Sequence, residues 1–124
     1  MGLIIKKVVL LGTKNIYKEV DALFDTGASL NCIGWKFRDS SSLDNVGISS
    51  FGEKKDILTP TGHAVEGIII NLKELKIGEK IVKNPKFCLF QMVHMFGRYD
   101  LIIGAELMQE LGISLKPITH ELIL

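Results

Sequence analysis

Short runs of β-branched and apolar residues, each ended by a turn signal, fill most of this sequence. Side chains of these kinds pack well on a pleated surface, so runs of this length favour strands over helices. The turn signals include residues 12–15 and the pair Gly78-Glu79. The pattern predicts an all-β fold. We expect strands at 4–11, 17–24, 29–34, 48–50, 74–77, 80–91, 113–115 and 118–124, with a hairpin over 53–72.

One helical segment is expected near the end of the sequence. Residues 106–111 place Leu107, Met108 and Leu111 on one face, and Gly112 follows as a C-terminal cap. The Ser-rich stretch 38–47 is expected to be a surface loop. No linker divides the sequence, and 124 residues with 47% apolar content suffice for one core. We therefore expect a single domain over 1–124.

The charge balance excludes several classes of partner. A formal net charge of +1 gives no overall field that would attract nucleic acid or an acidic membrane surface. Lys6 and Lys7 interrupt the first apolar run, and no small-residue cleavage site follows it, so it predicts a strand and not a secretory signal. We expect a cytoplasmic protein that binds neither nucleic acid nor membrane.

Cysteine and histidine usage predicts no metal site. Cys32 and Cys88 are too few for a disulfide framework, and their apolar surroundings are typical of buried thiols. The three histidines, His63, His94 and His120, have no carboxylate or cysteine at metal-ligand spacing. No metal and no other cofactor is expected.

The segment with the clearest chemical character is a strand that runs into Asp25, Thr26, Gly27, Ala28 and Ser29. Because apolar residues 22–24 come directly before it, the Asp25 carboxylate is expected in a partly desolvated position, where an unpaired acid is costly. Glycine permits a tight bend and alanine leaves room for a ligand. A plain surface turn would not need apolar residues 22–24 directly before it.

A carboxylate in such a position can work as one half of a pair. Two facing carboxylates cannot both ionise comfortably, so they share one proton. The ionised member can activate water while the protonated member polarises a carbonyl oxygen. No other aspartate in this sequence is followed by Thr or Ser and then Gly. A two-fold axis in a homodimer would supply the second carboxylate.

The sequence resembles the retroviral-type aspartic proteases, including their single-domain cellular members. Residues 20–33 are similar to the catalytic strand and loop of that family. Residues 100–105 resemble its second element, two hydrophobic residues and a glycine beneath the active loop, which leads into the helix at 106–111. Residues 57–65 are similar to its flap hairpin. The strand pair at 67–77 and 80–90 is similar to that of the cellular members.

The resemblance implies a closed, barrel-like retropepsin-type fold with one short C-terminal helix. It also implies an obligate homodimer that hydrolyses polypeptide without a cofactor. Asp25 is then the catalytic acid and base, Thr26 bonds across the dimer through its hydroxyl, and Gly27 contacts the substrate backbone. We expect further substrate contacts from Ala28, Ser29, Thr61, Gly62 and His63.

Two other functions stay open from the sequence. A non-catalytic module with the same fold and dimer would hold an extended peptide by strand-like hydrogen bonds. A dimerisation domain would carry the Asp-Thr-Gly motif by accident, although an unpaired, partly buried acid would destabilise it. The intact motif favours an aspartic endopeptidase.

Overall fold

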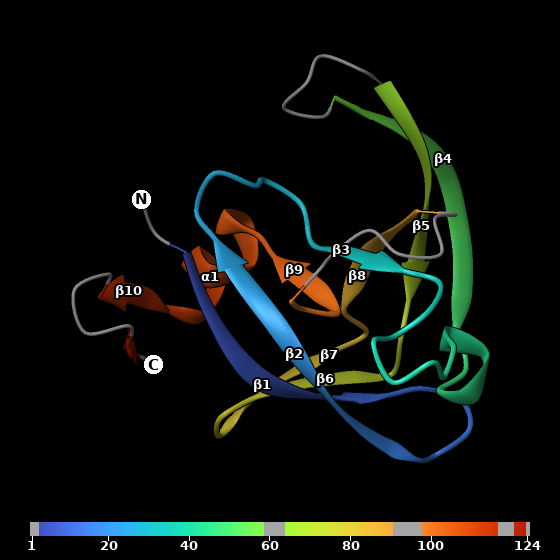
Figure 1. The fold of residues 1–124 in the computed structure, drawn as a ribbon, viewed down its shortest axis with the longest axis horizontal. Helices are drawn as coiled ribbons and strands as arrows, with labels where there is room; N and C mark the ends of the chain where they lie inside the picture. Colours follow the sequence, from blue (N-terminus) through green and yellow to red (C-terminus); the bar gives the residue numbers. More distant parts are fainter. Residues whose placement is uncertain (1–2, 59–63, 91–97, 117–120, 124) are drawn as a thin grey trace.

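The computed structural model describes residues 3–58, 64–90, 98–116 and 121–123. The fold is mostly β, with one α-helix and one 3₁₀ helix among these residues (Figure 1), which confirms the all-β prediction. In chain order the elements are β1 (Leu3–Leu11), β2 (Tyr17–Asp25), β3 (Cys32–Gly34), η1 (Leu43–Asn45), β4 (Ser50–Leu58), β5 (Ala64–Asn71), β6 (Glu74–Ile77), β7 (Lys80–Lys83), β8 (Lys86–Phe90), β9 (Leu101–Ile103), α1 (Ala105–Leu111), β10 (Ser114–Lys116) and β11 (Glu121–Ile123).

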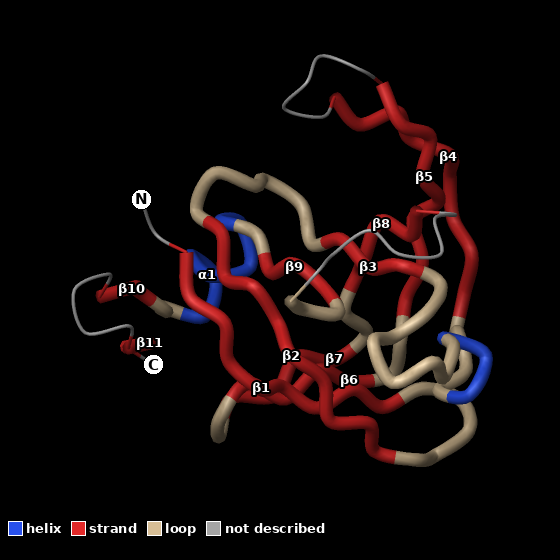
Figure 2. Tube along the Cα trace, in the orientation of Figure 1, coloured by secondary structure: helices blue, strands red, loops and turns tan. Residues whose placement is uncertain are grey.

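Nine of the strands form one sheet, in the order β4-β5-β8-β3-β9-β2-β1-β6-β7. The sheet curls, with the β1–β2 pair and the β4–β5 hairpin on opposite sides of β3, β8 and β9 (Figure 2). β10 and β11 form a separate antiparallel pair. None of the described helices is long and apolar enough to cross a membrane.

The central strands are joined in an unusual order. β9 pairs in parallel with β2 and antiparallel with β3, so it lies between two strands that are neighbours in the sequence. The connection from β2 to β3, residues 26–31, therefore passes over the end of β9. β3 pairs in parallel with β8 on its other side. This arrangement places the Asp25 segment directly above the end of β9.

Turn chemistry explains most strand boundaries. Gly78 adopts φ 60° in the two-residue turn between β6 and β7, a conformation that glycine accepts without strain. The predicted strand at 80–91 is two strands, because Asn84 adopts φ 51° and Pro85 has no backbone N–H to donate. The predicted strand at 29–34 is confined to Cys32–Gly34, and the one at 48–50 is only the start of β4.

The Ser-rich stretch 38–47 differs from the expected surface loop. It contains the 3₁₀ helix η1, and both Leu43 and Val46 are buried in the main hydrophobic core. The Asn45 carboxamide oxygen accepts a hydrogen bond from the backbone N–H of Ser42 and so closes the turn. The many polar residues of this stretch indicate a surface loop, but its two apolar side chains anchor it to the core.

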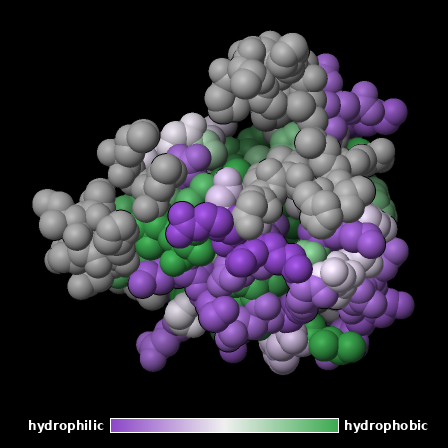
Figure 3. All heavy atoms as spheres, viewed as in Figure 1, coloured by the Kyte–Doolittle hydropathy of each residue, from purple (hydrophilic) through white to green (hydrophobic). Residues whose placement is uncertain are grey.

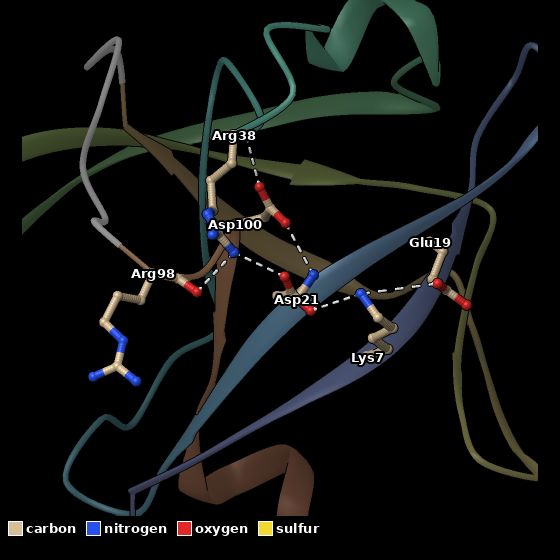
Figure 4. A network of polar contacts seen from close by, with 6 residues as sticks. All are labelled: Lys7, Glu19, Asp21, Arg38, Arg98 and Asp100. Carbon is tan, nitrogen blue, oxygen red and sulfur yellow. Dashed lines mark hydrogen bonds and ion pairs between the residues drawn. The ribbon is translucent and has the colours of Figure 1, made fainter.

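A buried aspartate, Asp100, connects β2 to the segment that follows β3 (Figure 4). The Asp100 side chain is only 8% exposed. Its carboxylate accepts hydrogen bonds from the backbone N–H groups of Asp21 at 2.9 Å and Arg38 at 2.8 Å (Figure 4). The Asp21 carboxylate in turn binds the Arg38 guanidinium at 2.8 Å and the Lys7 ammonium at 3.2 Å. Asp100 thus joins β2 to the segment that follows β3.

We expect Asp100→Ala to lower the free energy of unfolding by about 2–4 kcal/mol, because two part-buried N–H groups lose a charged acceptor. Asp44→Ala is the matched control, since Asp44 is exposed in η1 and its loss should change stability by less than about 0.5 kcal/mol. Urea denaturation followed by circular dichroism measures both. Equal stability of the two variants would contradict the role given to Asp100.

Candidate active site

The Asp25 loop is held by its own backbone. β2 ends at Asp25, whose side chain is half-buried. Its Oδ1 atom accepts a hydrogen bond from the backbone N–H of Gly27 at 2.8 Å, and its carbonyl oxygen accepts one from Ala28 at 3.1 Å. The carboxylate is therefore fixed in direction, while Thr26 and Gly27 beside it are exposed.

Gly104 and Asn31 fasten the other side of this loop. The backbone N–H of Ala105 donates to the Ala28 carbonyl oxygen at 2.7 Å, and that of Gly104 donates to Asn31 Oδ1 at 2.9 Å. A Cβ atom at Gly104 would lie 2.7 Å from the Leu30 carbonyl oxygen and 2.9 Å from that of Ala28. Only glycine permits this approach, so the glycine expected beneath the loop is confirmed.

Asn31 belongs to the site, although its place in the sequence does not indicate such a role. Its Nδ2 group donates to the Lys86 carbonyl oxygen at 3.1 Å while its Oδ1 accepts from Gly104. One side chain therefore joins the loop to β8 and to the start of α1. An asparagine after a glycine-containing turn carries no sequence signal of such a role.

An apolar floor extends across the sheet beside Asp25. Register partners follow one another from Leu23 on β2 to Ile102, Cys32, Cys88 and Ile69 on successive strands. Because register partners point to the same face, these side chains share one face with Asp25, which lies two residues beyond Leu23. We call the cluster of Cys32, Ile69, Cys88, Phe90 and Ile102 the apolar floor. It is separate from the main core.

The electrostatics place the floor close to the carboxylate. Burial raises the pKa of the Cys32 thiol to about 12, with smaller contributions from Cys88 and from the negative charge of Asp25. Burial also raises the pKa of the Tyr99 phenol, and Asp25 adds to that shift. Both cysteines are buried free thiols, as predicted.

A cavity of about 500 Å³ adjoins the loop and the floor, and we call it the loop cavity. Its lining comes from the loop, the β4–β5 hairpin, β8 and α1, and includes Ser29, Asn31, Lys55, Ile69, Cys88 and Glu106. Hydrophobic side chains reach the surface below the hairpin and also at the left of the view, among hydrophilic ones (Figure 3).

The structure brings together the expected loop residues Asp25, Thr26, Gly27, Ala28 and Ser29. Ala28 is half-buried and Ser29 is exposed beside the cavity. The expected contacts Thr61, Gly62 and His63 lie outside the described residues, in the connection between β4 and β5. No group of three or more His, Cys, Asp or Glu side chains within the described ranges could hold a metal ion.

Comparisons with known proteins bear on the fold. The sequence matches no protein-family model and no curated protein. The structure is similar to the crystal structure of a Legionella pneumophila protein of unknown function (DUF785), with a TM-score of 0.55 and 19% identity over 94% of this chain and 95% of that one. At this level of identity the likeness concerns the fold alone.

We expect Gly104→Ala to displace the Asp25 loop and to lower the free energy of unfolding by about 1–3 kcal/mol, because the added methyl meets two backbone carbonyl oxygens. Ser29→Ala on the same loop is the control, since that side chain is exposed. Urea denaturation measures stability, and amide exchange of residues 26–31 measures the displacement. Unchanged exchange and stability in Gly104→Ala would contradict the close approach.

Proposed function

We propose that this protein is an aspartic endopeptidase of the retropepsin type, active as a homodimer. The observation that carries the proposal is the position of Asp25. A half-buried carboxylate stands at the end of a central strand, is oriented by the amide of its own loop and shares a sheet face with the apolar floor, while Ser29 and Asn31 of the same loop line the cavity. An ordinary surface turn does not require a partly buried carboxylate that is held in one orientation.

The order of the central strands supports the finer part of the fold proposal. A loop that begins with Asp-Thr-Gly and lies over a hydrophobic strand ending in glycine is the arrangement that the resemblance implies. The short helix α1 follows that glycine, also as implied. We therefore propose a barrel-like retropepsin-type fold that the second subunit completes.

The need for a second carboxylate supports the dimer. The sequence contains one Asp-Thr-Gly motif, so the second carboxylate of a catalytic pair has to come from another chain. A symmetric homodimer supplies it. Thr26 and Gly27 are exposed in the single chain, which leaves the Thr26 hydroxyl free to approach a partner loop. Asp25 from each subunit would then face the other across the axis.

In the proposed mechanism the two carboxylates share one proton. The ionised carboxylate takes a proton from a water molecule as it attacks the peptide carbonyl, and the protonated carboxylate donates to the carbonyl oxygen. The substrate lies as an extended strand, its side chains over the apolar floor and its backbone beside Gly27. The β4–β5 hairpin, with Thr61, Gly62 and His63 in its connection, covers it as a flap.

We expect Asp25→Asn to reduce cleavage of heat-denatured casein by about 10²–10⁴-fold, because the amide keeps the shape and removes the titrating group. Asp44→Asn, on an exposed turn, should leave the rate unchanged. Peptide release measured by mass spectrometry gives both rates. Retained peptide binding without cleavage in the wild type would instead identify a non-catalytic peptide-binding module, and equal rates in wild type and Asp25→Asn would refute the assignment.

We also expect specific activity to fall on dilution, once the protein concentration drops below the dimer dissociation constant. Sedimentation velocity at each concentration gives the dimer fraction. Activity should follow that fraction, and Thr26→Ala should move both curves to higher concentration because it removes a bond across the axis. A fully active monomer would refute the composite site.

A further inference from the structure

One side of the loop cavity carries a cation that the proposed mechanism does not use. Lys55 lies on β4 and lines the cavity together with Ile69 and Cys88 of the apolar floor. It has no ion pair or hydrogen bond with any other side chain in the part of the chain that the structure describes. An unpaired ammonium that points toward a cavity is free to bind an anionic group from a ligand.

The register of the hairpin explains why Lys55 points toward the floor. Lys55 is the partner of Gly67 on β5, and Gly67 is the partner of Phe90 on β8, so all three share the face of the floor. Gly67 has no side chain, and the Cys88 thiol occupies the space where one would lie. A Cβ atom there would lie 2.4 Å from Cys88 Sγ.

Electrostatics agree with this placement. Burial raises the pKa of the Cys88 thiol, and the positive charge of Lys55 opposes that rise. The ammonium therefore acts directly on Cys88, in the middle of the floor. It lies on the face of the hairpin that borders the apolar floor and not on the opposite face.

Two of the neighbouring lysines differ from Lys55, because each has an acidic partner. Lys54 points to the opposite face of β4 and pairs with Glu66 at 3.6 Å. Lys83, which also lines the cavity, pairs with Glu74 at 3.2 Å. Glu106 and Glu110 line the cavity from α1 and would repel an anion at the helix side. Lys86 at the start of β8 also lines the cavity and has no ion pair among the described residues, so the attraction for an anion extends from the hairpin to the start of β8.

We propose that Lys55 selects polypeptide substrates that carry an acidic side chain near the cleaved bond. The inference rests on the proposed peptidase function and names its substrate class. A Glu or Asp side chain that extends over the floor toward the hairpin reaches the Lys55 ammonium. A lysine or arginine at the same position meets a like charge instead.

The sheet geometry limits where that acid lies in the substrate. Lys55 lies on β4, five strand spacings from β2, and it lines the same cavity as Cys88 on β8, so an acid that it binds lies over β8. From β2, which carries Asp25, to β8 there are three spacings of about 4.8 Å, or about 14 Å along the sheet. An extended peptide rises about 3.3 Å per residue. The acidic residue is therefore expected within about four residues of the cleaved bond, on one side of it.

The first test is a cleavage profile. Heat-denatured casein and albumin are digested with wild type, Lys55→Met, Lys55→Glu and Lys54→Met, and the termini of the products are sequenced by mass spectrometry. Wild type should cut with acidic residues enriched about fivefold at one position within four residues of the bond. Lys55→Met should lose this enrichment, Lys55→Glu should favour Lys and Arg there, and Lys54→Met should keep the wild-type profile.

Two outcomes of the profile would overturn the inference. One is a wild-type profile with no acidic enrichment at any position within four residues. The other is an enrichment that persists in Lys55→Met. Added salt should reduce the wild-type enrichment, because an exposed charge pair is screened.

A second test separates this inference from the proposed function. Asp25→Asn protein is titrated against two fluorescein-labelled decapeptide pools that differ only in one Glu or Gln among apolar residues, and anisotropy gives the affinities. The Glu pool should bind about fivefold more tightly, and Lys55→Met in the Asp25→Asn background should abolish the difference. Equal binding of both pools would overturn the role of Lys55. Absence of wild-type cleavage alongside a Glu preference would overturn the peptidase and leave the acidic subsite intact.

Discussion

β9 pairs with β2 on one side and β3 on the other, and this double pairing determines where the Asp25 loop lies. The loop has to cross the end of β9, and it can lie flat there only because Gly104 has no side chain. Two hydrogen bonds, from Ala105 to Ala28 and from Gly104 to Asn31, then fix its height above the strand. The direction of the Asp25 carboxylate depends on these contacts.

The same pairing builds the surface beside the carboxylate. Because β9, β3, β8 and β5 are aligned in register, their side chains form a continuous apolar floor from Ile102 to Ile69. Asp25 lies toward one end of this floor and Lys55 toward the other. A peptide that lies across it would contact the Asp25 carboxylate, then the apolar floor, and then the Lys55 ammonium. The two ends of the proposed site therefore differ in charge, and this difference would set the orientation of a bound peptide.

The strands, turns and helix that depend on neighbouring residues could be predicted from the sequence. Alternation and the Gly78 turn predicted β6 with its observed bounds, and periodicity with a glycine cap predicted α1 to within one residue. Burial of Leu43 and Val46 was missed, because serines around them indicate a loop whether or not its apolar residues face a core. The Asp25 loop was predicted because its motif is contiguous in the sequence.

The remaining site residues come from distant parts of the chain. Asn31 and Lys55 have ordinary sequence surroundings, and only the strand order brings both of them to the loop cavity. The sequence places Asp100 at the start of a hydrophobic element, whereas in the structure its carboxylate joins two backbone segments. Long-range hydrogen bonds of this kind depend on topology, which single-sequence patterns do not determine.

The central claim is that each active site contains one Asp25 from each of two subunits. Wild type and Asp25→Asn protein can be mixed at fixed total concentration and allowed to exchange subunits before cleavage is measured. If the site is shared, only wild-type homodimers are active, so an equal mixture should show about a quarter of the wild-type activity. About half of the wild-type activity, falling linearly with the wild-type fraction, would show that each chain acts alone and would contradict the claim.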